Sequence, residues 1–211
     1  MIEISILDTK SANFHSVKKA VDQYNPNNEI TSNIDIIEKS KGLIIPGVST
    51  TDTVLSNIKK LGLEETINDF YNSGKPILCI CVGMQILFEK SEEGKIPGLG
   101  ILKGSVKKIP ESKNNEKFKV PHMGWNQLNL NKNNKLFEGV DNNSNFYFVH
   151  SYYCDPEEDK IISGTTKYSI EMCASIKQNN LYAVQFHPEK SAADGLKIYK
   201  NFINIVGGSL R

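Results

Sequence analysis

The 211-residue sequence has only four cysteines, one tryptophan and no long hydrophobic run. The cysteines, Cys79, Cys81, Cys154 and Cys173, form no disulfide framework, so we expect free thiols in a reducing compartment. No stretch is apolar enough to span a membrane, and the first residues lack the basic and apolar segments of a signal peptide. These absences lead us to expect a cytoplasmic protein with no membrane partner.

An excess of charge of one sign is also absent, because 25 basic and 24 acidic residues leave a net charge of +1. Proteins that bind nucleic acids use clustered positive charge to neutralise phosphates, so we exclude nucleic acid as a partner. Hydrophobic residues make up 39% of the chain, which is enough for a substantial core. With no linker or internal repeat in the sequence, we expect a single domain over residues 1–211.

The first half of the chain alternates β-like and helical patterns, whereas the second half is rich in β-like segments. The expected strands are 2–7, 43–45, 76–80, 101–108, 127–130, 146–149, 162–166, 172–176 and 182–186. The expected helices are 13–21, 51–60, 63–72 and 192–206, with hairpins or loops at 111–119 and 130–135. Because strands that alternate with helices form parallel sheets, we predict an α/β fold. It should have a mostly parallel central sheet flanked by helices, with additional antiparallel strands in the second half.

The apolar strand at 76–80 ends at Cys81, and the chain then passes through a glycine into an amphipathic helical stretch at 84–89. A thiol at such a turn lies at the carboxyl edge of a sheet and at a helix N-terminus, where backbone N–H groups favour the thiolate. Gly83, two residues later, would relieve crowding at the turn, as in nucleophile elbows. These features predict a nucleophile at Cys81, and the alternative is a buried cysteine that acts only as a small apolar residue.

A base for this thiol is found at His187, which follows a short β-like run and precedes Pro188. Proline biases the residue before it toward extended backbone, and residues two apart in an extended chain point the same way. We therefore expect Glu189 to lie beside His187. A carboxylate there can hold the imidazole in one tautomer and stabilise the imidazolium once the thiol proton moves. The alternative is a histidine at a strand end on a solvated turn.

Three longer strings accompany this pair: PHMGWN at 121–126, FYFVHSYY at 146–153 and QFHPEKS at 185–191. With a cysteine elbow followed much later by His-Pro-Glu, the sequence resembles the class I glutamine amidotransferases. Within that family it resembles the glutaminase subunits of imidazole glycerol phosphate synthase, from residue 4 to residue 202.

The resemblance implies a glutaminase reaction. Cys81 would attack the side-chain amide of L-glutamine, His187 would transfer protons, and Glu189 would orient His187. A γ-glutamyl thioester would then be hydrolysed, releasing glutamate and ammonia without a metal or another cofactor. The residues that would hold the amino-acid end of glutamine and line its pocket are Gln85, Glu93, His150, Ser151 and Tyr152.

The resemblance also implies an oxyanion hole. The family has Pro-Gly-Val-Gly where this chain has Gly47, Val48 and Ser49 after a proline, and a rotated peptide there supplies one donor beside the N–H of Val82. Ser49 replaces a glycine, so a positive φ at that position would carry a steric cost. That cost would not arise if the N–H of Val48 is the donor.

A partner is implied as well, a (β/α)₈-barrel cyclase that forms a heterodimer with the glutaminase. The cyclase would use the ammonia to make imidazole glycerol phosphate and AICAR in histidine biosynthesis. By the same resemblance, the glutaminase would be nearly silent until the cyclase binds its ligand. His122 and Trp125, in the first of the three strings, are expected to contribute packing and partner contact rather than catalysis.

The sequence departs from the family at its opening motif, Asp-Tyr-Gly-x-Gly-Asn, which is here residues 8–13 with Lys10 and Ala12 in place of the glycines. Together with Ser49 and Cys79, these differences leave the ammonia acceptor open. The first alternative is a paralogous glutaminase that supplies a sugar-amidating synthase for surface glycans, and the second is a catalytically silent regulatory protein. The weakest alternative is a Cys-x-Cys metal site, because no second ligand pair lies nearby in the sequence.

Overall fold

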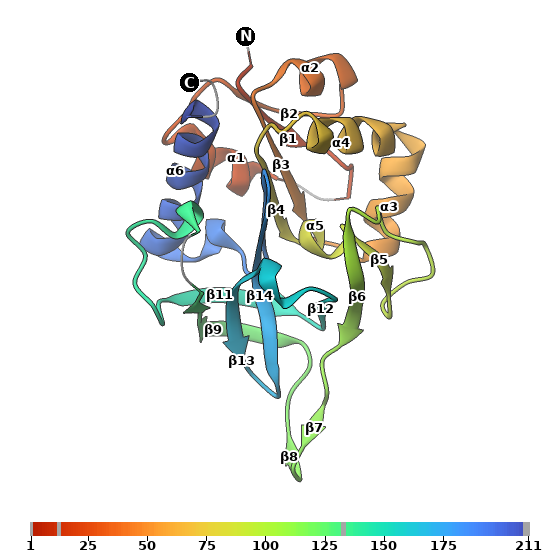
Figure 1. Ribbon diagram of the computed structural model, residues 1–211, viewed down its shortest axis with the longest axis vertical. Helices are drawn as coiled ribbons and strands as arrows, with labels where there is room; N and C mark the ends of the chain where they lie inside the picture. The colour runs from red at the N-terminus through yellow and green to blue at the C-terminus, as the bar shows by residue number, and fades with distance from the viewer. Residues whose placement is uncertain (1, 12–13, 132–133, 209–211) are drawn as a thin grey trace.

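The computed structural model describes residues 2–11, 14–131 and 134–208. Among them, a central sheet of 11 strands follows the order β2-β1-β3-β4-β15-β14-β12-β6-β5, with β13 paired to β14 and β10 paired to β13 (Figure 1). Two further sheets of two strands each, β11-β9 and β7-β8, lie outside this path. The central sheet has a parallel half and an antiparallel half, which meet between β15 and β14.

The parallel half consists of β1 (Ile4–Leu7), β2 (Asn28–Thr31), β3 (Gly42–Gly47), β4 (Ile77–Cys81) and β15 (Leu181–Val184). Every residue of β1, β3, β4 and β15 is buried, as expected for parallel strands that are covered on both faces. Figure 1 shows α1 (His15–Asp22) and α6 (Ala192–Gly208) on one side of these strands and α2 (Ile34–Lys39), α3 (Thr51–Lys60) and α4 (Leu63–Asn72) on the other. No helix in the described ranges is long and apolar enough to cross a membrane.

The antiparallel half extends the same sheet through β14 (Glu171–Gln178), β12 (Tyr152–Pro156) and β6 (Leu102–Lys108), and β5 (Phe88–Ser91) adds a parallel edge. β13 (Ile162–Lys167) and β10 (Asn129–Leu130) branch from β14. β9 (His122–Gln127) and β11 (Asn145–His150) pair with each other as an antiparallel two-stranded sheet. The β7–β8 hairpin (Ser112–Lys113 and Glu116–Lys117) projects from the body of the molecule in Figure 1, as expected for 111–119.

The predicted fold class is confirmed, and the predicted elements of the parallel half appear with boundaries shifted by at most two residues. Residue 13 of the first predicted helix and residues 132–133 of a predicted loop lie outside the described residues. β2 and α2 were not predicted, because each is short. β2 is a four-residue edge strand that is only partly buried, and α2 has six residues that begin after the N-cap Asn33.

The predicted helix at 84–89 is wrong. Only one helical turn, α5 (Val82–Gln85), follows Cys81, and the chain then enters β5. The stretch 82–88 is buried throughout, so it has no polar face toward water. The N–H groups of Leu99 and Leu102 bond the carbonyls of Ile86 and Leu87 at 2.8 and 3.0 Å, in place of a further helical turn.

The predicted strand at 127–130 is corrected to the ends of two strands, because β9 stops at Gln127 and β10 begins at Asn129. Between them Leu128 turns into the core, with its backbone bonded to Ser144 and Asn143. β9 itself and β12 were not predicted. Both are rich in polar and aromatic residues, and both are formed by pairing with distant segments rather than by a local apolar pattern.

Candidate active site

Cys81 stands at a sharp turn between β4 and α5, with φ 56° and ψ −112°. This positive φ is costly for a residue with a side chain, and it is held by close backbone packing. Gly47 of β3 is the register partner of Cys81, and a Cβ on Gly47 would lie 2.6 Å from the backbone nitrogen of Gly83. A Cβ on Gly83 would lie 2.0 Å from the carbonyl oxygen of Ile45. Two glycines therefore allow the elbow that the sequence predicts.

His187 and Glu189 form the second part of the site, with 2.7 Å between Nδ1 of the histidine and Oε1 of the carboxylate. The expectation of extended backbone at Glu189 is wrong, because Pro188 begins the 3₁₀ helix η3 (Pro188–Lys190), and this turn carries Glu189. Burial lowers the pKa of His187, but hydrogen bonds and charge interactions with Cys81 and Glu189 outweigh it and raise the pKa to about 10. The imidazole is thus held as a cation beside the sulfur of Cys81 at neutral pH.

Two hydroxyl groups hold this pair in place. Tyr199 of α6 is fully buried, and its hydroxyl donates to Oε2 of Glu189 at 3.2 Å. The hydroxyl of Ser191 donates to the carbonyl of His187 at 2.6 Å and accepts from the N–H of Tyr147 at 2.9 Å. Sequence reasoning assigned no role to Tyr199, since an aromatic residue on the apolar face of the last helix is typical of core.

Cys81 opens onto a cavity of about 240 Å³. The cavity is lined by Ser49, Cys81, Val82, Gln85, Glu93, Pro121, Val149, His150, Ser151 and Tyr152. Sites for drug-sized ligands have roughly 300–1,000 Å³, so this cavity suits a smaller molecule. All five residues that the resemblance assigned to the substrate lie here together. Oε2 of Glu93 is anchored at the rim by the N–H of Thr51 at 2.7 Å.

The segment expected to supply an oxyanion donor leaves the carboxyl end of β3 at Gly47. Val48 is 44% exposed, whereas Ser49 and Val82 both line the cavity. Ser49 does not have a positive φ, so its side chain carries no left-handed strain in this conformation. The identity of the donor in this segment remains a prediction.

The four thiols differ sharply in their surroundings. Cys79 is buried in the core two residues before Cys81, and burial raises its pKa well above the ordinary value. Burial also raises the pKa values of Cys154 and Cys173, which are opposite each other on β12 and β14. Of these four, only Cys81 lines the cavity and interacts with His187. The position at the turn, and not the residue type, distinguishes it.

Residues 5–205 match the family model described as glutamine amidotransferase class-I. The chain belongs to the class I glutamine amidotransferases. Among curated relatives of this amidotransferase, the imidazole glycerol phosphate synthase subunit HisH of Moorella thermoacetica is 42% identical over 207 residues, which is 98% of this chain and 96% of the relative. The HisH subunit of Methanocaldococcus jannaschii is 44% identical over 204 residues, which is 96% of this chain and all of the relative.

A solved structure shows the same fold. The glutaminase domain of CTPS from Trypanosoma brucei matches the amidotransferase with a TM-score of 0.70 and 15% sequence identity. The match covers 99% of this chain and 94% of the other. At this identity the likeness concerns the fold alone.

Two glutamine side chains connect the elbow of the amidotransferase to the opposite wall of the cavity. Nε2 of Gln185 lies 3.6 Å from Sγ of Cys81, and Oε1 of Gln185 accepts from Nε2 of Gln85 at 3.0 Å. Nε2 of Gln85 also donates to the carbonyl of Tyr152 at 3.0 Å. Gln185 lies in one of the three strings that resemble the family, but the sequence predicts no role for it, because nothing in the sequence indicates which buried glutamine faces a thiol.

His122 and His150 form a second histidine group in the amidotransferase, with 2.9 Å between Nδ1 of His122 and Nε2 of His150. His122 is buried and stacks on Phe148 and Tyr168, with ring centroids at 4.9 and 4.3 Å. Burial lowers the pKa of His122 to about 4 and that of His150 to about 3. Both rings are therefore neutral at neutral pH, and His122 packs as expected.

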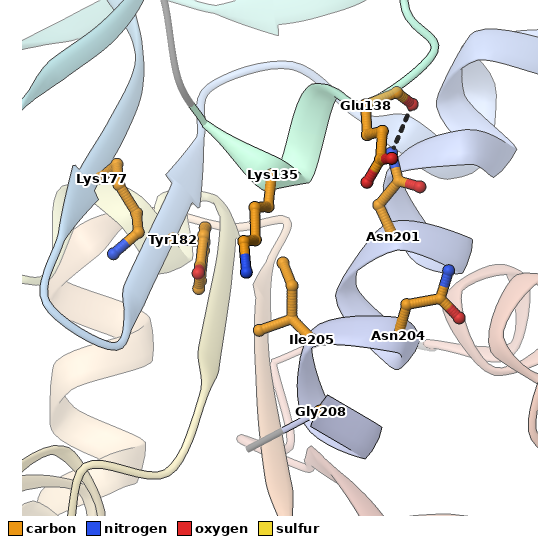
Figure 2. Close-up of a pocket in the computed structure, with 8 residues that line it drawn as sticks. All are labelled: Lys135, Glu138, Lys177, Tyr182, Asn201, Asn204, Ile205 and Gly208. Atoms are coloured by element: carbon orange, nitrogen blue, oxygen red, sulfur yellow. Dashed lines mark hydrogen bonds between the residues drawn. The ribbon is translucent and has the colours of Figure 1, made fainter. Parts of the chain in front are cut away.

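A larger hollow of about 550 Å³ lies elsewhere on the amidotransferase, and Figure 2 shows its lining residues, which come from η1 (Lys135–Phe137) and the residue after it, β14, β15 and α6. The ammonium of Lys177 lies 4.7 Å from the ring centroid of Tyr182 on this surface. The lining residues include no cysteine or histidine. Size alone therefore does not identify the site of the chemistry.

Proposed function

We propose that this chain is the glutaminase subunit of an imidazole glycerol phosphate synthase and hydrolyses L-glutamine to glutamate and ammonia. One observation carries the proposal: a thiol on a strained elbow lines a cavity of amino-acid size and interacts with a charged His187–Glu189 pair. The HisH names of relatives at 42 and 44% identity support the histidine branch over a sugar-amidating synthase. The intact Cys81, His187 and Glu189 oppose a silent regulatory protein.

In the first half-reaction, the thiolate of Cys81 attacks the side-chain carbonyl carbon of glutamine. The carbonyl becomes an oxyanion, which the N–H of Val82 and a donor from Gly47, Val48 or Ser49 would stabilise. Protonated His187 then gives its proton to the departing nitrogen, the C–N bond breaks, and ammonia leaves. A γ-glutamyl thioester remains on Cys81.

In the second half-reaction, water attacks the thioester while His187 takes one of its protons. The C–S bond breaks, the sulfur departs as thiolate, and glutamate is released. The resting charges of Cys81 and His187 are thereby restored. Throughout, Glu189 keeps Nε2 of His187 toward the sulfur by holding Nδ1.

The cavity lining supports binding of the amino-acid end of glutamine by polar groups opposite the thiol. Gln85, Glu93 and the backbone of His150, Ser151 and Tyr152 present both acceptors and donors there. The carboxylate of Glu93 suits the ammonium of the substrate, because opposite charges attract strongly in a partly dehydrated cavity.

We further propose a heterodimer with a (β/α)₈-barrel cyclase that receives the ammonia, and a cytoplasmic location like that expected for other biosynthetic enzymes. The exposed side chains of Met123 and Trp125, 61% and 55% accessible on β9, support a docking surface near the cavity. Large exposed apolar residues that lie together are typical of protein interfaces. Residues 1–211 would act as one domain, since both halves share the central sheet.

Covalent labelling with a diazo-ketone analogue of glutamine tests the nucleophile. Mass spectrometry should find the label on the peptide that contains Cys81, and Cys81→Ala should abolish it. Cys79→Ala is the matched control and should keep the label, because Cys79 lies in the core. A label on Cys79 in the wild-type chain would overturn the assignment.

Glutamate production tests the partner. The chain alone should release little glutamate, and addition of a cognate cyclase with its ribonucleotide ligand should raise the rate. Cys81→Ala should lower the stimulated rate by about 10⁴-fold or more, as loss of a nucleophile does in other enzymes. An unchanged rate with the liganded cyclase, together with normal labelling of Cys81, would reject this partner while keeping the glutaminase.

A further inference from the structure

The sulfur of Cys81 has a second polar neighbour besides His187. Gln185 follows β15 and is completely buried, and its Nε2 lies 3.6 Å from Sγ. A buried amide contributes to stability only when its donors and acceptors are paired, so this contact matters to the fold as well as to the thiol. An N–H group donates a stronger hydrogen bond to a sulfur atom when the sulfur is negatively charged.

The orientation of this amide follows from the chemistry of its neighbours. The carbonyl oxygen of Tyr152 can only accept, so the atom of Gln85 that faces it at 3.0 Å must be Nε2. The second hydrogen of that nitrogen points to Gln185 at 3.0 Å, so the atom of Gln185 there must be Oε1. The remaining atom of the Gln185 amide is the NH₂ group, and it faces Cys81.

The same carbonyl is fixed from its other side. Nδ1 of His150 lies 2.8 Å from the Tyr152 oxygen and must donate to it, which leaves Nε2 of His150 as an acceptor. Nδ1–H of His122 donates to that acceptor, and Nε2 of His122 in turn accepts from Asn126 at 3.1 Å. Both lone pairs of the carbonyl are therefore used: the hydrogen bonds from His150 and from Gln85 converge on it, and from Gln85 the donors point outward through Gln185 to the sulfur.

We propose that Gln185 is a thiolate-binding residue of the glutaminase reaction, with its side-chain N–H donating to Sγ of Cys81 while Gln85 and the Tyr152 carbonyl hold it in that orientation. This inference rests on the proposed role of Cys81 as the nucleophile. The bond is strongest when the sulfur carries charge, which is before attack on glutamine and when the thioester breaks. It therefore stabilises the resting thiolate and helps the sulfur to leave during hydrolysis.

Alkylation of Cys81 by iodoacetamide as a function of pH tests the proposal, with the extent measured by mass spectrometry on the Cys81 peptide. Gln185→Met keeps the length of the side chain and removes the donor. It should raise the pH midpoint of alkylation by about one unit, because the thiolate loses a hydrogen bond that the neutral thiol makes only weakly. The plateau rate at high pH should rise about threefold, because thiolate nucleophilicity grows with basicity with a coefficient of about 0.4–0.5.

The control is Gln178→Met, at the end of β14, which makes the same replacement away from the cavity. It should leave both midpoint and plateau unchanged. A merely structural role for Gln185 would slow alkylation or lower the melting temperature without raising the plateau. A folded Gln185→Met chain with the wild-type midpoint would overturn the proposal.

A second measurement uses only the wild-type chain, so it does not depend on whether a variant folds. The side-chain amide resonance of Gln185 in the wild-type chain, followed by nuclear magnetic resonance, should shift with the same midpoint as the alkylation curve. An amide resonance that stays fixed while Cys81 titrates would overturn the inference. Alkylation requires no bound glutamine, so failure of the glutamine-analogue labelling alone would count against the proposed function and not against the Gln185–Cys81 bond.

Discussion

The cavity lies between two regions in which the pKa of histidine is shifted in opposite directions. The catalytic edge, made of Cys81, His187 and Glu189, carries a histidine whose pKa is raised to about 10. The neutral wall, made of His122 and His150, carries two histidines whose pKa values are lowered to about 4 and 3. Burial lowers the pKa in all three cases. What differs is the partner: anionic groups reverse the effect of burial at the catalytic edge, and the neutral wall has none.

This difference gives the two regions opposite pH dependence. The pKa of His187 is higher in the folded protein than its unfolded value near 6.5. Its contribution to the free energy of unfolding is therefore complete below pH 6.5 and is lost as the pH rises toward 10. His122 and His150 bind their protons less tightly when folded. Their contribution to stability is complete above pH 6.5 and is lost as the pH falls toward about 4 for His122 and about 3 for His150. Stability should therefore be highest near neutral pH.

The largest effect is expected from Gly83→Ala, which breaks the catalytic edge itself. The added methyl group would lie 2.0 Å from the Ile45 carbonyl oxygen, which is backbone and cannot rotate away. We expect a loss of about 3 kcal/mol or more in the free energy of unfolding, the upper range for overpacking, and no labelling of Cys81. Urea unfolding measures the loss of stability, and labelling with the glutamine analogue measures the loss of reactivity at Cys81.

Gly207→Ala is the matched control, since no heavy atom lies within 4 Å of its added methyl group in α6. It should leave labelling intact and change stability by less than about 1 kcal/mol. Normal labelling of a Gly83→Ala chain would show that the elbow tolerates a side chain, contrary to the packing argument.

Next in size is Glu189→Gln, which removes one of the two partners, Cys81 and Glu189, that raise the pKa of His187. An amide can donate to Nδ1 and so favour the wrong tautomer, and a comparable replacement in serine proteases costs about 10⁴-fold in rate. We expect a loss approaching that size in cyclase-stimulated glutamate production. The decline of stability between pH 6.5 and 10 should also become shallower. Retention of the wild-type decline would mean that Cys81 alone raises the pKa of His187.

A smaller effect is expected from His122→Phe in the neutral wall. Phenylalanine keeps the stacking on Phe148 and Tyr168 but leaves Nε2 of His150 without its donor. The free energy of unfolding should fall by about 1–3 kcal/mol, the cost of one unpaired buried polar group. KM for glutamine should rise more than kcat falls, because His150 lines the cavity.

The pH profile separates this explanation from simple loss of packing. With one buried neutral histidine removed, His122→Phe should lose less stability between pH 6.5 and 4 than the wild-type chain. The slope above pH 6.5 should be unchanged, because His187 is untouched. An equal shift at every pH would indicate packing alone.

The two regions also differ in how well they can be predicted. The catalytic edge is built on parallel strands whose apolar runs are continuous, and its residues lie within a few positions of the strand ends, so Cys81, Gly83 and His187 stand out in the sequence. Even there, the one-turn helix after Cys81 and the 3₁₀ turn that carries Glu189 were missed. Both depend on hydrogen bonds and burial that local periodicity does not report.

The neutral wall could not be derived from the residues alone. Its two histidines are separated by 28 positions in the chain, and Gln85, which shares the Tyr152 carbonyl with His150, bonds Gln185 100 positions away. Its strands are short and carry aromatic and polar residues in no simple alternation. Family resemblance named Gln85 and His150, but the direction of their hydrogen bonds depends on one carbonyl, that of Tyr152. Such a network exists only once the sheet is assembled.

The smallest effect is expected from Lys10→Gly in the loop after β1, where the family has glycine. Lys10 has φ 54°, a left-handed conformation that costs a side-chain-bearing residue about 1–2 kcal/mol. Its N–H bonds Oδ1 of Asp8 at 2.9 Å, and its ammonium forms an ion pair with the same carboxylate. Glycine relieves the strain but loses the exposed ion pair, worth about 0–1 kcal/mol, and costs about 0.5–1 kcal/mol in chain entropy.

These opposing contributions should leave the unfolding free energy of Lys10→Gly within about 1 kcal/mol of the wild-type value. Lys10→Val is the contrasting variant, and it should destabilise by about 1–2 kcal/mol because a β-branched residue fits a positive φ poorly. Both variants should keep the two pH slopes, since Lys10 contacts neither histidine group. A change in either slope would mean that this loop is coupled to the catalytic edge or to the neutral wall.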